Sequence, residues 1–189
     1  MQITDVHNVL QRCIDYHGHY CAGQSLGVRI AKKGLELVAA EDQKDLIVFV
    51  ENDRCIADAV LMATGTRLGR RSLKFVDYGK MAATFINLKR GIAYRVGLKP
   101  VDYSDALRDD SEDNAREQVL MLADEELLFW KKVTVRLKKE ELPGKPERIV
   151  NCVKCGEKVF DAKDLAGDGT DAGPFCVSCV HGSYYEAEE

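Results

Sequence analysis

The stretch Thr84-Phe-Ile-Asn-Leu-Lys-Arg-Gly-Ile-Ala-Tyr-Arg-Val-Gly-Leu98 decides the fold class. Residues 84–88 and 92–98 have the composition of strands, and Lys89-Arg90-Gly91 between them suits a short turn. The stretch therefore predicts a hairpin. Adjoining hairpin strands are typical of α+β proteins, whereas a doubly wound sheet needs helical crossovers. We therefore expect an α+β core with a mixed or antiparallel sheet and packed helices.

Helical and strand patterns on both sides of this hairpin complete the predicted core. A helix is expected after an N-cap at Thr4, because apolar residues recur at helical spacing until Gly18. A second helix should begin near Ser25 and reach Val38. The other expected elements are a strand at 46–50, a helix at 55–64, a strand at 73–77, a long helix from Glu112 to about Phe129, and a strand over Val133, Val135 and Leu137.

Composition places the chain among ordinary globular proteins. Of its 189 residues, 46% are hydrophobic and 31% are charged, which excludes collagen-like and disordered chains. No apolar run approaches membrane-spanning length, and the first residues lack the pattern of an export signal, so we expect a cytoplasmic protein. Seven cysteines in such a protein indicate metal or thiol chemistry rather than a disulfide framework.

Charge is distributed unevenly along the chain. Residues 65–99 carry nine Lys or Arg and one acidic residue, although the whole chain has a net charge of −4. Residues 151–189 carry three basic and eight acidic residues. Since phosphate binding depends on Lys and Arg, this balance argues against nucleic acid as a partner.

The four distal cysteines form two CxxC pairs, Cys152-Val-Lys-Cys155 and Cys176-Val-Ser-Cys179. Two such pairs complete the tetrahedral sulfur site of structural zinc, and we expect a small treble-clef or zinc-ribbon-like finger that depends on the metal to fold. A redox role for each pair would need a thioredoxin-like context, for which this tail is too short. The predicted domains are a core over 1–140, a linker over 141–150 and the finger over 151–189.

Three side chains that can bind metal lie close together near the N-terminus. His17, His19 and Cys21 occupy alternate positions, which in an extended segment face the same side and converge on one ion. Cys21 also precedes the predicted second helix, whose positive end is expected to lower the thiol pKa. The residues alone leave open a polar cluster in a buried loop without metal.

Several motifs of the chain resemble those of one known family. His17-Gly-His-Tyr-Cys-Ala-Gly-Gln-Ser-Leu-Gly27 is similar to the HGHxCxGxxLG opening of the formylmethanofuran dehydrogenase FmdE family, with Ala22 where many members have Pro. The resemblance spans residues 17 to about 86, and the longer members carry a C-terminal zinc finger. The other similar segments are Glu51-Asn-Asp-Arg-Cys55 with Asp58-Ala59, Thr64-Gly-Thr66 with Gly69, and Asp77-Tyr-Gly-Lys-Met-Ala82.

The resemblance implies a function in one-carbon metabolism. The main enzyme of that system is a molybdenum or tungsten oxidoreductase of methanogenesis that reduces carbon dioxide onto methanofuran. It implies an α+β core, a treble-clef-type finger and a homodimer, with this chain as an enzyme or as an accessory subunit of a larger dehydrogenase complex.

The matched motifs also imply a metal site in the core. Cys55 follows a predicted strand whose end can bring it over the 17–21 loop. His19, Cys21 and Cys55 would then be three ligands of a second divalent metal, with zinc expected and His17 as a fourth ligand or an outer partner. Three protein ligands leave a coordination position open for water or substrate.

Further polar residues are candidates for ligand binding or catalysis. Arg67, Arg70 and Arg71 form a possible anion site for a carboxylate or phosphate, or else a solvated face. Asp77 and Lys80, with Cys21, are the catalytic candidates, although Asp77 and Lys80 form a structural ion pair in the alternative interpretation. The competing function is a non-catalytic adaptor in which both metals are structural and the acidic finger docks a protein partner.

Overall fold

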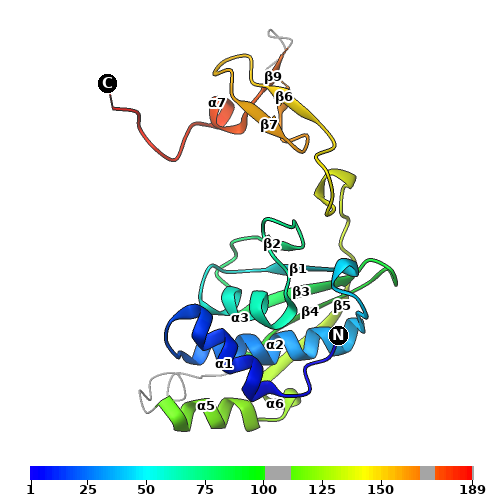
Figure 1. The fold of residues 1–189 in the computed structure, drawn as a ribbon, viewed down its shortest axis with the longest axis vertical. Helices are drawn as coiled ribbons and strands as arrows, with labels where there is room; N and C mark the ends of the chain where they lie inside the picture. Colours follow the sequence, from blue (N-terminus) through cyan, green and yellow to red (C-terminus); the bar gives the residue numbers. More distant parts are fainter. Residues whose placement is uncertain (101–111, 167–172, 189) are drawn as a thin grey trace. The chain divides into compact units, whose positions relative to one another are not determined.

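The computed structural model describes residues 1–100, 112–166 and 173–188 (Figure 1). The chain divides into two compact units, Met1–Arg136 and Leu137–Glu189, and each is described by itself. We call them the core and the finger unit.

The core contains a five-stranded mixed sheet in the order β2-β1-β3-β4-β5. The predicted hairpin is present, with Asn87 and Ile92 as the last antiparallel pair before a turn in which Gly91 has a φ of 63°. β1 and β2 are parallel because α3 connects them, and the remaining neighbours are antiparallel. The α+β prediction is therefore confirmed. The strands are β1 (Leu46–Val50), β2 (Leu73–Phe75), β3 (Ala82–Asn87), β4 (Ile92–Leu98) and β5 (Leu128–Val133).

Helices cover one face of this sheet (Figure 1). α2 supplies Leu26, Ile30 and Leu35, which are buried in one apolar cluster with Val48 of β1 and Phe85 of β3. This cluster is the main hydrophobic core and ties α2 to the middle of the sheet. The helices are α1 (Val6–His17), α2 (Ala22–Val38), the 3-10 helix η1 (Gln43–Asp45), α3 (Cys55–Thr64), α5 (Glu112–Met121) and α6 (Asp124–Leu127).

The starts of the first two helices differ slightly from the predictions. Asp5 rather than Thr4 is the N-cap of α1, because its carboxylate accepts a hydrogen bond of 2.9 Å from the backbone N–H of Asn8. α2 begins at Ala22, three residues before the predicted start at Ser25, and its N-cap is Cys21. This earlier start puts Cys21 directly at a helix end.

The long helix predicted from Glu112 to Phe129 is wrong. α5 ends at Met121, the one-turn helix α6 follows, and β5 begins at Leu128 instead of Val133. The apolar run that resembles the end of a helix is a strand, because every residue from Leu128 to Val133 pairs with a residue of β4. Tertiary pairing has overridden the local periodicity.

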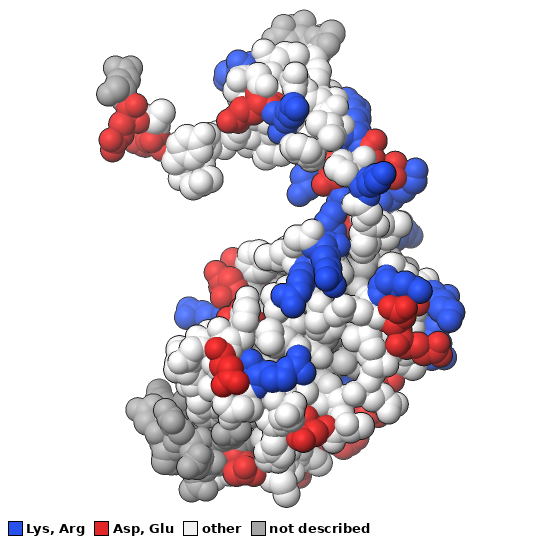
Figure 2. All heavy atoms as spheres, viewed as in Figure 1, with Lys and Arg blue, Asp and Glu red and all other residues white. Residues whose placement is uncertain are grey.

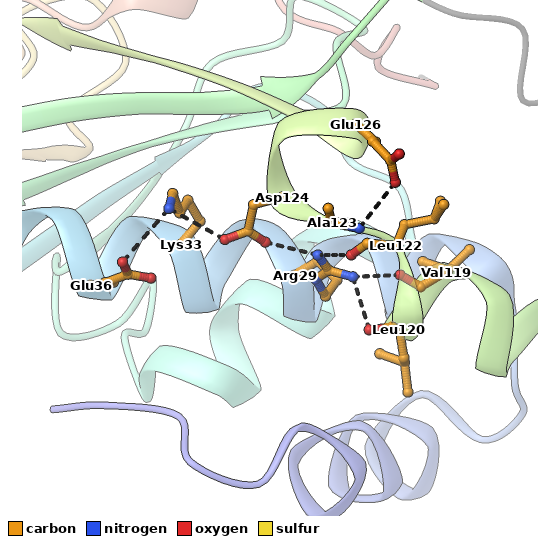
Figure 3. Close-up of polar contacts among 9 residues, drawn as sticks. All are labelled: Arg29, Lys33, Glu36, Val119, Leu120, Leu122, Ala123, Asp124 and Glu126. Atoms are coloured by element: carbon orange, nitrogen blue, oxygen red, sulfur yellow. Dashed lines mark hydrogen bonds and ion pairs between the residues drawn. The ribbon is translucent and has the colours of Figure 1, made fainter.

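A buried arginine from α2 explains where α5 ends (Figure 3). The guanidinium of Arg29 donates to the carbonyl oxygens of Val119, Leu120 and Leu122 at 2.7, 3.0 and 2.6 Å, and to the Asp124 carboxylate at 2.8 Å. The last carbonyls of a helix lack partners within the helix, so a cation beside them stabilises its end. Arg29 therefore caps α5 from another element.

The described residues of the finger unit form two short hairpins, a 3-10 helix and an α-helix. Its elements are η2 (Lys139–Glu141), β6 (Ile149–Asn151), β7 (Lys158–Phe160), β8 (Leu165–Ala166), β9 (Pro174–Phe175) and α7 (Val177–His181). β6 pairs with β7, and β8 pairs with β9, both antiparallel. The first CxxC lies between β6 and β7, and the second lies at the start of α7. This arrangement with four cysteines is consistent with a zinc ribbon.

Crossing a bilayer as a helix requires both length and a continuous apolar surface. Among the residues that the structure describes, no helix has this combination.

Candidate metal centres

Three side chains in the core offer metal ligands at one place. One ligand atom each from His17, Cys21 and Cys55 lies within 4.8 Å of the other two. We call these residues the core centre. All three are partly buried. One imidazole nitrogen and two thiol sulfurs are donors that zinc prefers, so the donor set fits a divalent metal.

The ends of three helices bring the core centre together. α1 ends at His17 because Gly18 has a φ of 94°, in the left-handed region that glycine adopts without strain. Cys21 is the N-cap of α2, and Cys55 is the first residue of α3, a few residues after β1. The ligands therefore come from a helix–turn–helix junction and a second helix start, rather than from an extended 17–21 segment.

Two glycines on α2 allow α3 to come close enough for the two thiols to meet. A Cβ atom at Gly27 would lie 2.6 Å from the Cβ of Ala59, which real side chains do not tolerate. A Cβ at Gly23 would lie 3.2 Å from the Cβ of Cys55 and 3.6 Å from the sulfur of Cys21. Their spacing of four residues on a helix is a sequence signal for close helix packing that the predictions above leave out.

Asp58 holds the imidazole of His17. The Nδ1 atom of His17 lies 2.8 Å from Oδ2 of Asp58. Because an ionised carboxylate can only accept, Nδ1 donates the hydrogen and Nε2 keeps its lone pair for a metal. Cys55 and Asp58 are three residues apart on α3 and share a face of it. Sequence reasoning did not give Asp58 this role, although that spacing is a usable signal.

His19 is not part of the core centre. It is exposed, and its ring centroid lies 4.8 Å from that of His17 with an interplanar angle of 45°. The family resemblance implies His19 as a ligand and His17 as the fourth ligand or outer partner. The structure instead places His17 beside the thiols, because the turn after Gly18 breaks the alternation on which the expectation rested.

The expected low pKa of Cys21 is also wrong. Burial, followed by the hydrogen bond with the Cys55 thiol, raises the Cys21 pKa to about 11, and the backbone N–H groups of Gln24 and Gly23 lower it only in part. Desolvation and the neighbouring thiol therefore raise the Cys21 pKa by more than the N–H groups at the helix end lower it. A metal ion that binds both sulfurs would displace their protons.

The four cysteines of the finger unit form the second cluster. The ligand atoms of Cys152, Cys155, Cys176 and Cys179 all lie within 4.8 Å of one another. Each CxxC makes a tight turn, in which Gly156 N–H donates to Cys152 O at 2.8 Å and Cys179 N–H donates to Cys176 O at 3.1 Å. Backbone N–H groups of Cys155 and Cys176 lower the pKa of Cys152 to about 6. The cluster can hold a tetrahedral metal ion through sulfur alone.

The three arginines of the predicted anion site lie away from the core centre. Arg67, Arg70 and Arg71 lie between the end of α3 and the start of β2, and Arg70 donates to the side-chain oxygen of Gln43 at 3.3 Å. Cys55 is at the other end of α3, so about 15 Å of helix separates the two places. The structure does not bring these arginines to the metal ligands.

Asp77 and Lys80 form no ion pair with each other in the described part of the chain. Asp77 accepts a hydrogen bond of 3.1 Å from Gly79 N–H, and the Lys80 ammonium lies 5.6 Å from the Tyr78 ring centroid. The backbone N–H groups of Tyr78 and Lys80 both donate to the carbonyl oxygen of Glu51. The loop is therefore attached to the end of β1 that leads to Cys55.

The chain is similar in sequence to a known family and to a known archaeal protein. A family model described as FmdE, Molybdenum formylmethanofuran dehydrogenase operon, matches residues 16–143. A probable S-adenosyl-L-methionine-binding protein of Archaeoglobus fulgidus is 30% identical over 206 aligned positions, which cover 94% of this chain. The match covers only 53% of that relative, so this chain spans about half of its length.

A solved structure has the same fold. It is a tungsten formylmethanofuran dehydrogenase FmdE-like protein from Syntrophus aciditrophicus, with a TM-score of 0.65 and 21% sequence identity. The similarity covers 96% of this chain and 95% of the other. At this identity the comparison shows the fold alone.

Proposed function

The chain belongs to the FmdE family, and from this premise we propose that it is a metalloprotein with an open metal site at the core centre. We propose further that it acts in one-carbon metabolism, as an enzyme or as an accessory subunit of a formylmethanofuran dehydrogenase-type complex. Family membership supports this setting, and the core centre supports the chemistry.

The observation that carries the proposal is the set of three converging donors. One histidine and two cysteines recur as the protein ligands of catalytic zinc, where the fourth position is left for water or substrate. A divalent ion held there supplies a Lewis acid and lowers the pKa of the water that it binds. His17, Cys21 and Cys55 would hold the ion, and Asp58 would orient His17.

The surroundings of the core centre suit a small anionic ligand. His17 has 18% of its side chain exposed, so solvent reaches the ligands. Arg54 precedes Cys55 and is exposed, and its guanidinium has no acidic partner among the described residues. Arg54 therefore carries a positive charge one residue before a candidate ligand. Formate is the simplest ligand of this kind with one carbon.

Cobalt substitution tests the proposal directly. The full chain, freed of metal and reloaded with cobalt(II), should bind two equivalents, one with the absorption of a four-thiolate site and one with weaker thiolate bands. Adding azide or formate should shift only the second set of bands, because only an open site accepts a further ligand. In a Cys155→Ser control, only the first set should disappear.

Two results would contradict the proposal. One cobalt equivalent per chain would mean that the core centre binds no metal. A second equivalent whose bands ignore azide and formate would indicate a closed site and would favour the adaptor function, with both metals structural. S-adenosylmethionine, which the name of the archaeal relative mentions, belongs in the same titration as a third ligand.

A further inference from the structure

The two thiols of the core centre lie in contact with each other. The thiol of Cys21 shares a hydrogen bond with that of Cys55, and both cysteines are free. A Cβ atom placed at Gly23 would lie 3.6 Å from the sulfur of Cys21 and 3.8 Å from that of Cys55, so one point of α2 adjoins both sulfurs. A disulfide needs its two sulfurs about 2.0 Å apart. The thiols are therefore close enough for rotation of the two side chains to join them.

The packing of α2 against α3 keeps these thiols together. Cys21 is the N-cap of α2, and Cys55 is the first residue of α3. A Cβ atom at Gly27 would lie 3.2 Å from Cα of Ile56 and 2.6 Å from the Cβ of Ala59, so the two helices touch through small groups. Ile56 is also buried in the main hydrophobic core. Because these contacts are apolar, they hold the pair without the help of a metal.

The third cysteine of the core has different surroundings. Cys13 is completely buried, and its sulfur lies 3.8 Å from the carbonyl oxygen of Ala59. The sulfur of Cys13 is not part of the group of ligand atoms at the core centre. Cys21 and Cys55 are both partly exposed. A small molecule from solvent can therefore reach the pair but not Cys13.

An uncharged reagent suits the surface of the core. Figure 2 shows Lys and Arg interspersed with Asp and Glu over the face of the core that it draws. That face has no field of one sign to attract a charged reagent. Hydrogen peroxide is uncharged, is small enough to reach partly buried groups, and oxidises thiols. Its chemistry therefore fits the exposure of the pair and the charges of the drawn face.

We propose that Cys21 and Cys55 are a site of reversible oxidation, at which a peroxide joins the two thiols in an intramolecular disulfide. One sulfur attacks a peroxide oxygen, the O–O bond breaks, and a sulfenic acid and water form. The second sulfur attacks the first, the S–O bond breaks, and the hydroxyl group leaves as water with the second thiol proton. The sulfurs lose two electrons in total, and hydrogen peroxide gains them. Two molecules of a small thiol reverse the reaction by exchange and leave as their own disulfide.

Oxidation would also control the metal content of the core centre. A metal binds the thiolate form of cysteine, and the disulfide consumes both sulfur donors, so that His17 alone remains. One imidazole is too few ligands for a zinc site, which takes at least three from the protein. A metal ion should therefore leave on oxidation and return on reduction. This consequence rests on the proposed function, whereas the disulfide itself does not.

Peptide mapping of the full chain tests the disulfide. The purified chain is treated with hydrogen peroxide, its remaining thiols are blocked, and it is cleaved with trypsin. Residues 13–29 should appear joined to residues 55–67, which are the tryptic peptides that contain Cys21 and Cys55. Burial raises the pKa of the Cys21 thiol, so we expect the reaction to take minutes to hours rather than seconds.

Two variants identify the sulfur that reacts, because residues 13–29 also contain Cys13. Cys13→Ala is the matched control and should form the same cross-link as the wild type. Cys21→Ser should form none. The proposal is overturned if the cross-link runs through Cys13 or joins two chains. It is also overturned if Cys21 and Cys55 stay reduced under conditions that oxidise a small reference dithiol.

Metal release separates this result from the proposed function. In Cys155→Ser, which should lack the finger metal, formation of the cross-link should release about one metal equivalent, and a small thiol with added zinc should restore it. A complete cross-link in a chain that never held this metal would support the disulfide and contradict the open metal site. Release of the metal by peroxide without a cross-link would overturn the disulfide and leave the metal site supported.

Denaturant titration gives a further measurement on the wild-type chain. An intramolecular disulfide restricts the unfolded chain, so the oxidised core should unfold at a higher denaturant concentration than the same core after its metal is removed by a chelator. A small thiol should abolish the difference. Unfolding of the oxidised core at a lower concentration would show that the two cysteines cannot be joined within the native packing, and would overturn the proposal.

Discussion

At the residue scale, the chemistry of the core centre depends on which atom of each side chain is free. Asp58 accepts from His17 Nδ1 and so leaves Nε2 for a metal, and Cys21 and Cys55 share a hydrogen bond that a metal would replace. His19 lies beside His17 but lacks an equivalent carboxylate among the described residues. Two histidines separated by one residue therefore have different surroundings.

We expect His17→Gln and His19→Gln to differ in metal content. His17→Gln should lose about one metal equivalent per chain, because it removes a donor of the core centre. His19→Gln should keep both metal equivalents, since the His19 ring lies outside the core centre. Elemental analysis of the purified variants gives the answer. Equal metal content in the two variants, or loss only in His19→Gln, would contradict this assignment.

Asp58→Asn should weaken metal binding at the core centre without removing a ligand. Loss of an outer carboxylate of this kind lowers metal affinity about 10–100-fold. Competition with a chelator measures the affinity, and the ¹⁵N chemical shifts of the His17 ring report its tautomer. Thermal unfolding should change little, because Asp58 is partly exposed. Unchanged affinity together with an unchanged tautomer would show that Asp58 does not position His17.

At the element scale, the approach of α2 and α3 decides whether Cys21 and Cys55 meet. Gly27 lies against the Cβ of Ala59 and the backbone of Ile56, so the helices touch through main-chain atoms there. No other residue type leaves that space empty. The glycine therefore acts on the core centre from more than one helical turn away.

Gly27→Ala should damage both stability and metal binding. The added methyl group has no room, and overpacking of this kind costs about 1–3 kcal/mol. Separation of the helices should also weaken metal binding. Gly69→Ala is the matched control, because a Cβ there meets nothing within 4 Å. Denaturant titration and chelator competition measure the two effects. A Gly27→Ala protein as stable as Gly69→Ala would contradict the close packing.

The α5–α6 break is a second property of elements rather than of residues. Arg29 has 6% of its side chain exposed and also pairs with Asp124, which receives a further contact of 3.3 Å from Lys33 (Figure 3). Burial alone would raise the pKa of Asp124, but the hydrogen bonds from Arg29 and Lys33 outweigh it and lower the pKa. The network therefore depends on an ionised carboxylate.

Arg29→Met should destabilise the core by about 2–4 kcal/mol at neutral pH, because it leaves helix-end carbonyls and Asp124 without their buried partner. Because the pKa of Asp124 is lowered in the folded protein, its carboxylate contributes its full stability above the ordinary carboxyl pKa of about 4. This contribution is lost as the pH falls below that value and through the lower pKa of the folded state. The difference from the wild type should therefore shrink in acid. Urea titrations across pH measure it. A difference independent of pH would argue against a role for the charge.

At the scale of the whole molecule, the two clusters that could hold a metal use different residues in different units. The core centre lies within Met1–Arg136, and the four-cysteine cluster lies within Leu137–Glu189. In the described part of the finger unit the strands are short and α7 has five residues, so the folding of this unit should depend on its metal. The core has a buried apolar cluster of its own and should not.

Cys21→Ser and Cys155→Ser should each remove a different metal equivalent. Cys21→Ser should leave the finger resistant to protease, whereas Cys155→Ser should expose residues 151–189 to cleavage while the core keeps its metal and its fold. Elemental analysis measures the metal content of each variant, and limited proteolysis measures whether its finger remains folded. Loss of both metals in either variant would show that the centres are coupled, and an unfolded Cys21→Ser core would make the core centre structural.

The sequence by itself determined the features that depend on neighbours along the chain. Periodicity and turn residues predicted β1 at 46–50, α3 at 55–64 and the β3–β4 hairpin, and CxxC spacing predicted the four-cysteine cluster. In each case the interaction spans a few residues, so the pattern is visible locally.

Only the tertiary structure decided the features that join distant residues. Arg29 binds the end of α5, which lies 90 residues further along the chain. β5 is a strand because it pairs with β4, and α3 places Cys55 and Asp58 beside His17. The position of His17 beside the thiols follows from α1, which ends at His17 before Gly18, and the raised pKa of Cys21 follows from burial beside Cys55. These outcomes depend on packing and desolvation, which exist only once the chain has folded.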